Sequence, residues 1–345
     1  MKIKKSLIAA FMIVFSVMLS SFAFYAYQIL YTPNILIDQE DRHITLEDGT
    51  TFKELQNKLY DERIVNDLVS FSFLAKAKGY DDKIKSGHYL LKRNMSNTEA
   101  INLLRSGLQS PVKITFNSVR KIDELAVRLT QTLQIDSADL APFLLSDSVA
   151  QVYGFNSNTF ISMFLPNTYE VYWNISPTQL LDRMKREFDN FWTKERLAKA
   201  DKLGLSPEEV ITMASIVDAE TNQMSEASAI AGVYINRIKK GYKFQADPTL
   251  KFAMNNFEIK RILNKDKLFD SPYNTYKYYG LPPGPINMPS IAAVESVLNA
   301  EDHRYLYFCA RPDFSGYHDF ANTLIEHNKN AEALHKTLNA NKIFR

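Results

Sequence analysis

An uncharged run at residues 7–27 constrains the fold of this 345-residue chain more than any other feature. A helix needs roughly 20 apolar residues to cross the hydrocarbon core of a bilayer, and this run is long enough. Lys2, Lys4 and Lys5 precede the run, and such a lysine bias places the preceding segment in the cytoplasm. The sequence therefore predicts a cytoplasmic segment at residues 1–6 and one transmembrane helix at residues 7–27, with the rest of the chain outside the cytoplasm.

A cleavable signal peptide is the alternative interpretation of the same run. Ser21 and Ala23 form a small-x-small pattern of the kind that signal peptidases cut. The run is longer than the usual apolar core of a signal peptide, and several aromatic residues follow Ser21 at its end. We therefore expect a retained anchor.

The charge balance argues against one class of partner. The 41 basic and 39 acidic side chains leave a formal net charge of +2, which offers little for neutralising the phosphates of nucleic acid. A neutral polymer such as a glycan suits this balance better. Cys309 is the only cysteine, so the chain can form neither an internal disulfide nor a thiolate-rich zinc site.

Two extracytoplasmic parts are expected after a linker at residues 28–43, and the first part is a small α/β module at residues 44–110. Its predicted strands and helices lie, in chain order, at residues 44–46, 51–60, 68–78, 87–91 and 96–104. This order resembles the LysM-like module of extracytoplasmic cell-wall proteins. A structural spacer without a ligand is an equally good interpretation.

The second part, residues 111–345, is predicted to be an α+β domain. Alternation predicts a strand at residues 112–116, and helical periodicity predicts helices at residues 122–133 and 180–194. An aromatic segment interrupted by a proline, residues 164–173, allows two interpretations. It is either part of the core or a wall on which sugar rings stack.

Glu220 is the leading catalytic candidate of this second domain. It lies at the end of a mostly apolar helical stretch that begins with Ser206, Pro207 and Glu209. These three residues form a capping box with a proline at the first helical position, which fixes the start of the helix. Apolar surroundings drive a carboxyl group towards its neutral, proton-donating form.

The helical spacing also says which residues surround this carboxyl group. At about 100° per residue, Met213, Ile216 and Val217 share a face with Glu220, whereas Asp218 points well away from it. The two carboxylates are therefore not expected to act as a close pair.

Polar residues cluster at three places after this helix. Residues 245–249 form the first cluster, and residues 271–290 form the second. Prolines and glycines in the second cluster predict a rigid, shaped loop rather than a helix or a central strand. The third cluster, residues 318–328, is predicted to open a helix. Its two histidines lack the spacing of a common zinc motif, so we expect no metal site.

Several of these stretches carry a resemblance to a known family. The blocks are, in chain order, residues 165–169, 214–221, 233–237, 245–249, 271–276, 280–286 and 326–328. Together they resemble the YceG-like family, the endolytic murein transglycosylases. The resemblance covers residue 44 to the carboxyl end, and the basic and then apolar amino terminus stands where that family has its anchor.

The resemblance implies an enzyme, a peptidoglycan lytic transglycosylase without a cofactor, in which Glu220 is the catalytic residue. This chain has Asp218 where the family often has Glu, a difference of one methylene that leaves the assignment of Glu220 intact. The side chains expected to bind the glycan substrate are Ser215, Gln245, Asp247, Thr249, Tyr273, Asn274, Tyr276, His318, Glu326 and Asn328.

The implied chemistry needs only one carboxylic acid. Neutral Glu220 would protonate the oxygen between N-acetylmuramic acid and N-acetylglucosamine, while the substrate's acetamido group stabilises positive charge at the anomeric carbon. The resulting carboxylate would take the proton of the muramoyl 6-hydroxyl, which closes on the anomeric carbon to give a 1,6-anhydro end. Glu220 would thus act first as an acid and then as a base, and no water is consumed.

The resemblance further implies a single-pass protein of the inner (plasma) membrane that cuts nascent strands from the periplasmic side. The expected partners are peptidoglycan glycan strands and the membrane, with peptidoglycan synthases as candidates and no nucleic acid. Two rival functions stay open. A non-catalytic glycan-binding scaffold would need no protonated Glu220, and a hydrolase would need a second carboxylate, for which Asp247 is the candidate.

The anchor generates the first prediction. Alkaline washing of membranes should leave the full-length chain in the pellet, because loss of ionic contacts does not release a helix that crosses the hydrocarbon core. Immunoblotting of pellet and supernatant measures this. Recovery of a soluble protein that begins near Ala23 would show that the apolar run is a signal peptide.

Overall fold

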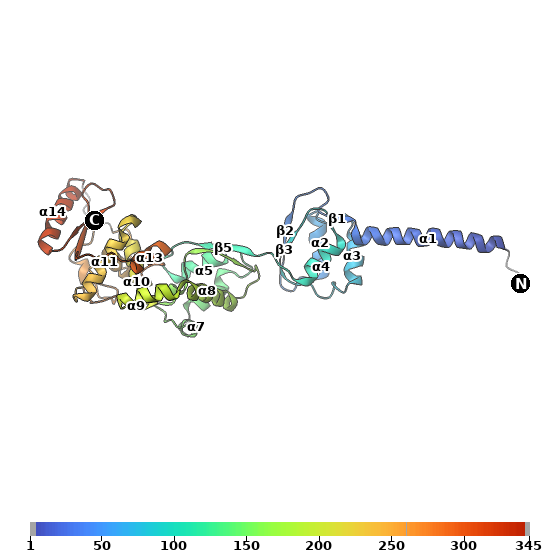
Figure 1. Ribbon diagram of the computed structural model, residues 1–345. Coiled ribbons are helices and arrows are strands. Elements are labelled where there is room, and N and C mark those ends of the chain that lie inside the picture. Colours follow the sequence, from blue (N-terminus) through green and yellow to red (C-terminus); the bar gives the residue numbers. More distant parts are fainter. Residues whose placement is uncertain (1–4, 260, 342–345) are drawn as a thin grey trace. The chain divides into compact units, whose positions relative to one another are not determined.

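The computed structural model describes residues 5–259 and 261–341 (Figure 1). Helices alternate with short two-stranded sheets, so the predicted α+β class with an apolar amino-terminal helix is confirmed. The chain divides into two compact units. Unit 1 runs to Lys113 and also includes Thr132–Gln134 and Glu170–Ile175, and the remainder forms unit 2. The sequence-based boundary at residue 110 does not include these two later segments in the first unit.

Helix α1 (Lys5–Tyr31) begins unit 1. Its side chains are mostly apolar and are exposed up to its last turns, and by length and composition it could cross a membrane. The helix is thus compatible with a single-pass anchor. Lys2 and Lys4, which carry the argument for its orientation, lie outside the described residues, as does the end of the predicted domain at residues 342–345.

The last turn of α1 belongs to the core of unit 1. Ile29 is buried, and its backbone oxygen accepts a hydrogen bond of 3.1 Å from Nδ2 of Asn97. Strand β1 (Pro33–Ile35) follows at once and pairs with β4 (Met95–Ser96). Residues 28–43, expected as a linker, therefore contribute a helix end, a strand and buried side chains.

A strand–helix–helix–strand series and one further helix make up the rest of unit 1. They are β2 (Arg42–Leu46), α2 (Phe52–Asp61), α3 (Leu68–Ala77), β3 (Gly87–Leu91) and α4 (Asn97–Ser106). Strands β2 and β3 are antiparallel, with Ile44 opposite Tyr89, and their alternating buried residues join one core with the helices. Helix α4 ends at Gly107, whose φ of 76° suits glycine.

Strands β5 (Val112–Phe116) and β6 (Asn167–Val171) pair with each other, and the division between the units falls within both. Strand β6 lies in the aromatic segment for which the sequence left two interpretations open. Tyr169 is buried, and its ring centroid lies 5.5 Å from that of Phe116. This packing favours the core interpretation over a wall for sugar rings.

Helix α10 is the central helix of unit 2. All its residues from Val210 to Val217 are buried, because the stretch is mostly apolar and the helix packs against α11, α12 and α13. The helices of unit 2 are α5 (Ile122–Thr130), α6 (Ser137–Leu145), α7 (Asp147–Val152), α8 (Pro177–Phe191), α9 (Lys194–Leu203), α10 (Pro207–Glu220), α11 (Met224–Lys239), α12 (Asp247–Ala253), α13 (Ile291–Leu298) and α14 (Leu324–Ala340), with short 3-10 turns at Phe160–Met163 and Asp266–Leu268.

A β-hairpin corrects one prediction. Residues 318–328 were expected to open a helix, but β8 (His318–Ala321) is a strand that pairs antiparallel with β7 (Tyr307–Ala310). Helix α14 begins only at Leu324. The reason is the capping box of Thr323 and Glu326, which fixes the helix start there, while strand pairing uses the residues before it.

Candidate active site

Helix α10 holds Glu220 at a fixed place because its start is capped and its interior is apolar. The predicted capping box is present: the Ser206 backbone N–H donates to the Glu209 carboxylate over 2.8 Å, and the Glu209 N–H donates to the Ser206 hydroxyl. Met213 and Val217 are fully buried, as the helical spacing predicts. Glu220 is the last residue of the helix.

The carboxyl group of Glu220 is enclosed, although the residue as a whole keeps some exposed surface. Its Oε1 accepts a hydrogen bond of 2.8 Å from the Tyr234 hydroxyl on α11. Burial first, and the negative charge of Asp247 second, raise the pKa of Glu220 to about 7. The Tyr234 hydrogen bond and the charges of Lys251 and Arg237 act in the opposite direction. A pKa near neutrality suits a group that gives up a proton and takes one back.

Asp247 and Tyr276 form a second carboxylate–tyrosine pair beside the first. The Tyr276 hydroxyl donates a hydrogen bond to Oδ1 of Asp247, the first residue of α12. Burial, followed by the charge of Asp247, raises the pKa of Tyr276, so its hydroxyl stays a donor. The charge of Glu220 acts in the same direction, which shows that the two pairs are close.

Arg237 is a buried cation on the same side of α11 as Tyr234. Its Nε donates to the backbone oxygen of Leu306 over 2.6 Å, and its terminal nitrogen donates to the backbone oxygen of Lys243 over 3.2 Å. Burial lowers the pKa of Arg237. Residues 233–237 form one of the blocks that resemble the family, but no role was predicted for them from the sequence. Their spacing of three residues, which puts Tyr234 and Arg237 on one helix face, was the signal that could have found them.

Ser215, expected to bind the substrate, holds the proline-rich loop (residues 271–290) in place. It is fully buried, and its hydroxyl accepts a hydrogen bond of 3.0 Å from the backbone N–H of Ile286. Gly284 permits a second close approach, because a Cβ there would lie 2.1 Å from the backbone oxygen of Asn158. The loop is therefore tied to the core from two sides.

Thr249 and Asn274, also expected to bind the substrate, are fully buried as well. The Thr249 hydroxyl lies 2.8 Å from that of Thr275. The Asn274 amide donates to the backbone oxygens of Lys267 over 3.0 Å and Phe269 over 2.6 Å. These contacts use the polar atoms of both side chains within the protein.

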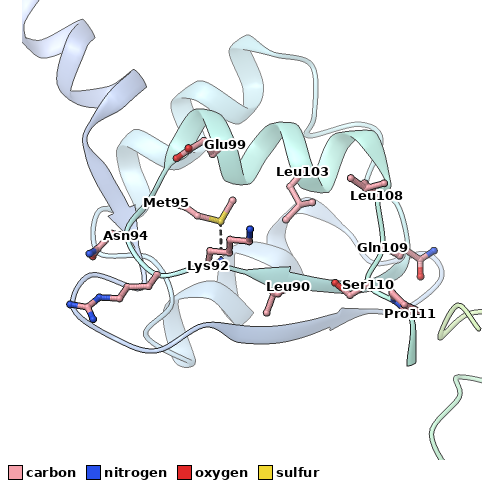
Figure 2. A pocket seen from close by; sticks show the side chains of 11 residues that line it. Leu90, Lys92, Asn94, Met95, Glu99, Leu103, Leu108, Gln109, Ser110 and Pro111 are labelled. Atoms are coloured by element: carbon pink, nitrogen blue, oxygen red, sulfur yellow. Dashed lines mark hydrogen bonds between the residues drawn. The ribbon is translucent and has the colours of Figure 1, made fainter. Parts of the chain in front are cut away.

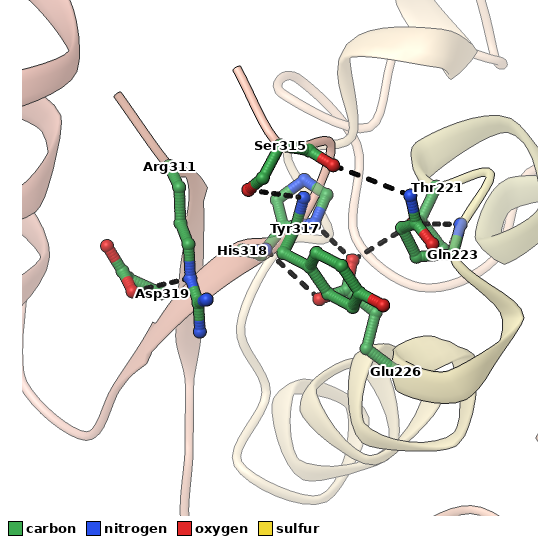
Figure 3. A network of polar contacts seen from close by, with 8 residues as sticks. All are labelled: Thr221, Gln223, Glu226, Arg311, Ser315, Tyr317, His318 and Asp319. Atoms are coloured by element: carbon green, nitrogen blue, oxygen red, sulfur yellow. Dashed lines mark hydrogen bonds and ion pairs between the residues drawn. The ribbon is translucent and has the colours of Figure 1, made fainter. Parts of the chain in front are cut away.

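His318 belongs to a buried polar network that joins α11 to β8 (Figure 3). The Glu226 carboxylate accepts the backbone N–H of His318 over 3.0 Å, and its other oxygen lies 2.7 Å from Nδ1 of that ring. The same oxygen accepts a hydrogen bond of 2.9 Å from the Thr221 hydroxyl. Because Thr221 directly follows Glu220, the network holds the end of α10. Glu226 was not predicted, although an acid at the start of an apolar helix was a visible signal.

The other predicted substrate residues keep exposed surface. Gln245 is exposed, and Tyr273 is partly exposed with its ring centroid 4.8 Å from that of Phe252. Glu326 caps its own helix, and Asn328 is exposed on that helix. Within residues 5–259 and 261–341, no group of three or more histidine, cysteine or acidic side chains could hold a metal ion.

A polar cavity of about 460 Å³ lies beside this group of residues. The segment before α5, the end of α10, α12 and the proline-rich loop line it. Lys251 is one of the lining residues, and its charge also reaches Glu220. Asp218 lies on the wall, and its Oδ1 accepts a hydrogen bond of 2.6 Å from the Ser290 hydroxyl. The Asp218 carboxylate thus accepts a hydrogen bond from the proline-rich loop, whereas the Glu220 carboxyl group accepts one from α11.

Unit 1 has a separate pocket of about 580 Å³ between β3, β4 and α4 (Figure 2). Leu90, Met95, Leu103 and Leu108 supply apolar lining, and Lys92 adds a cation. No residue of this pocket was singled out from the sequence.

Comparisons with known proteins show which family the chain resembles. A model of the YceG-like family matches residues 44–333. A protein named endolytic murein transglycosylase from Streptococcus pneumoniae serotype 2 strain D39 is 28% identical over 376 aligned positions, which cover 97% of this chain and 66% of that protein. This chain thus spans just under two thirds of that relative's length. A protein of the same name from Bacillus subtilis strain 168 is 29% identical over 307 positions, 84% of each chain.

A solved structure is also similar. The 2.6 Å crystal structure of a YceG-like protein from Listeria monocytogenes is 27% identical in sequence and has a TM-score of 0.53. The match covers 84% of this chain and 98% of that one.

Asn274→Ala tests the internal role of this side chain. The substitution leaves the partly buried backbone oxygens of Lys267 and Phe269 without their donor, so we expect a loss of about 2 kcal/mol in the free energy of unfolding. Denaturant unfolding measures it, with Asn256→Ala, at an exposed position, as the control. Unchanged stability together with weakened glycan binding would instead make Asn274 a sugar-contacting residue.

Glu220→Gln tests the burial of the carboxyl group. The pKa of Glu220 is raised from 4.5 to about 7 in the folded protein, so the folded state keeps a proton that the unfolded state releases. Stability is therefore lost as the pH rises from about 4.5 through about 7, whereas glutamine keeps the acceptor for Tyr234 and never ionises. We expect the variant to melt at a higher temperature than the wild type at about pH 8, and at a similar temperature below about pH 4.5.

Thermal melts across this pH range supply the measurement. Glu258→Gln, at an exposed position, is the matched control and should show no pH-dependent difference from the wild type. A Glu220→Gln difference that is equal at both ends of the range would contradict the enclosed carboxyl group.

Proposed function

The chain belongs to the YceG-like family, and on this premise we propose that it is an endolytic peptidoglycan lytic transglycosylase with Glu220 as its acid and base. The observation that carries the proposal is the enclosed Glu220 carboxyl group, whose pKa of about 7 allows both roles near neutral pH. The names of the streptococcal and Bacillus relatives, endolytic murein transglycosylase, support the substrate class.

Tyr234 organises the first step. Its hydroxyl donates to Oε1 of Glu220, which leaves Oε2 to carry the acidic proton towards the glycosidic oxygen. As the proton leaves, negative charge develops on the carboxylate. The Tyr234 hydrogen bond and the positive charges of Arg237 and Lys251 stabilise that charge.

Glu220 then acts as the base of the second step. The glycosidic bond has broken in the first step, with its oxygen leaving as a hydroxyl of N-acetylglucosamine. The carboxylate takes the proton of the muramoyl 6-hydroxyl, whose oxygen bonds to the anomeric carbon in place of the broken bond, and the acid is restored. The acetamido group of the substrate stabilises the anomeric carbon between the two steps, so no protein nucleophile is required. The product ends in a 1,6-anhydro ring.

The exposure of the other predicted substrate residues separates those that could contact the sugars from those that support the site. We assign Gln245, Asp247, Tyr273 and Tyr276, which keep exposed surface, to contact with the sugars. Glu326 and Asn328 stay candidates on α14. The buried Ser215, Thr249, Asn274 and His318 support the shape of the site, because their polar atoms bind protein groups.

A hydrolase is the second candidate, because the Asp247 charge reaches Glu220 and could assist a water molecule as a base. The Asp247 carboxylate already accepts the Tyr276 hydroxyl, which favours a role in orientation. The ends of the products distinguish the two reactions.

The proposal also includes the location of the chain in the cell. Helix α1 would hold the chain in the inner membrane with its amino terminus in the cytoplasm and both units in the periplasm. The strand–helix–helix–strand order of unit 1 supports a LysM-like module. An enzyme held at the membrane would cut nascent strands and so end their elongation, with peptidoglycan synthases as candidate partners.

Glu220→Gln is the direct test of the mechanism. The variant removes the acidic proton but keeps the shape, so release of products from purified glycan strands should fall by about 10²- to 10⁴-fold. Asp218→Asn on the same helix should cause a smaller loss, because that carboxylate binds Ser290 on the cavity wall and does not contact the Glu220 carboxyl group. Activity of the wild type should also fall above about pH 7, where Glu220 ionises.

Mass spectrometry of the products identifies the reaction. Anhydro ends support the lytic transglycosylase, reducing ends would show the hydrolase, and binding without cleavage would show a scaffold. Near-normal cleavage by Glu220→Gln, or equal damage from Asp218→Asn, would refute the single-carboxylate mechanism.

A further inference from the structure

We propose that the polar cavity beside Glu220 is a subsite for the peptide stem of the substrate, and that Arg120 and Lys251 bind a carboxylate of that stem. The inference rests on the proposed function and adds a substrate requirement to it. The cavity would make the enzyme prefer strands that carry charged stems.

The cavity has firm walls. The segment before α5 contributes Val119, whose backbone oxygen accepts a hydrogen bond of 2.8 Å from the N–H of Met288 in the proline-rich loop. The opposite wall is α12, whose position is fixed by the buried contact between Thr249 and Thr275. The cavity volume of about 460 Å³ is large enough for a short peptide segment, and it far exceeds the volume of a single water molecule.

Two cations on the wall are available to a ligand. The Arg120 guanidinium carbon lies 4.4 Å from the ring centroid of Phe257, which holds the side chain at the cavity. Among the residues that the structure describes, neither Arg120 nor Lys251 forms an ion pair or a side-chain hydrogen bond. Both lysine and arginine bind carboxylates well when they are free to do so.

The carboxylates of the same wall already have partners. Oδ1 of Asp218 accepts the Ser290 hydroxyl over 2.6 Å, and Oε2 of Glu124 accepts the backbone N–H of Arg120 over 3.2 Å. Neither carboxylate forms an ion pair with Arg120 or Lys251 in the described part of the chain, so both cations stay open to a ligand. An anion suits this arrangement better than a cation.

The chemistry of the substrate identifies the anion. Sugar rings of a glycan strand carry hydroxyl and acetamido groups, and the carboxylates of stem-bearing peptidoglycan lie on the peptide. The stem leaves the muramoyl ring, the same ring whose anomeric carbon must lie at Glu220. Lys251 lines the cavity and also acts on the Glu220 carboxyl group, so the cavity begins close to that ring.

Asn287 adds a second feature that suits a peptide. Its Nδ2 donates to the backbone oxygen of Ser215 over 3.3 Å, which orients the amide on the cavity wall. Its Oδ1 has no hydrogen-bond partner among the residues in the described part of the chain. An unpaired acceptor of this kind suits the N–H of a stem peptide bond.

The experiment compares three substrates for the full-length chain in detergent. They are glycan strands with native stems, the same strands with the stem carboxylates converted to methyl amides, and strands stripped of stems by an amidase. The readout is kcat/KM for total cleavage, whatever ends form. Arg120→Gln is the test variant, Arg120→Lys retains the charge, and Arg128→Gln on α5 is an exposed control away from the cavity.

We expect the wild type to cut native strands about three- to tenfold faster than amidated ones, a ratio typical of one partly exposed charge pair. The ratio should fall in Arg120→Gln, in which Lys251 remains, should approach one at about 0.5 M salt, and should persist in Arg120→Lys and Arg128→Gln. Equal cleavage of native and amidated strands by the wild type would overturn the charge-based subsite. The same loss of the ratio in Arg128→Gln would show a general charge effect and overturn the assignment to this cavity.

Stripped strands separate the stem from the lactyl group of the muramoyl ring. An amidase leaves a lactyl carboxylate on each ring, so stripped strands cut as fast as native ones would overturn the stem as the ligand. Cleavage of no strand at all would have a different meaning, because it would refute the proposed function and, with it, the inference.

Discussion

Enclosure of the Glu220 carboxyl group is the constraint on which the rest of unit 2 depends. An ionisable group in apolar surroundings is costly when charged, so the helix that carries it must itself be held firmly in the interior. This explains why α10 is buried on all sides from Val210 to Val217 and why its start is capped so fully. The Tyr234 hydrogen bond and the nearby charge of Arg237 moderate the cost without removing it.

The buried polar side chains around the site have a common physical cause. A proline-rich loop cannot satisfy its backbone groups by helix or strand pairing, since proline lacks an N–H and its neighbours are held in extended conformations. Side chains do this work instead: the Ser215 hydroxyl accepts the backbone N–H of Ile286, and Oδ1 of Asn274 accepts the backbone N–H of Tyr276. Residues that mark the family resemblance are therefore required inside the protein as well as at its surface.

Local signals predicted much of this structure from the sequence. The capping box at Ser206 predicted a helix start, and the apolar face of α10 identified Glu220, because these patterns depend only on neighbouring residues. The strand at His318 and the partners Tyr234 and Glu226 were missed, because long-range pairing decides them. The neighbouring residues of Asn274 in the loop do not indicate whether its side chain is buried or exposed. Its burial could therefore not be predicted from the sequence.

The charge of Lys251 acts on both the Glu220 carboxyl group and the polar cavity. Its positive charge lowers the pKa of Glu220, which opposes the protonation that the first step of the proposed mechanism needs. A stem carboxylate bound at the cavity would offset that charge, so the pKa of Glu220 would rise when the proposed ligand is present. The acid would then be more fully protonated in the complex than in the free enzyme. Binding of a charged stem would in this way favour the chemical step as well as the position of the strand, since the same lysine acts on both.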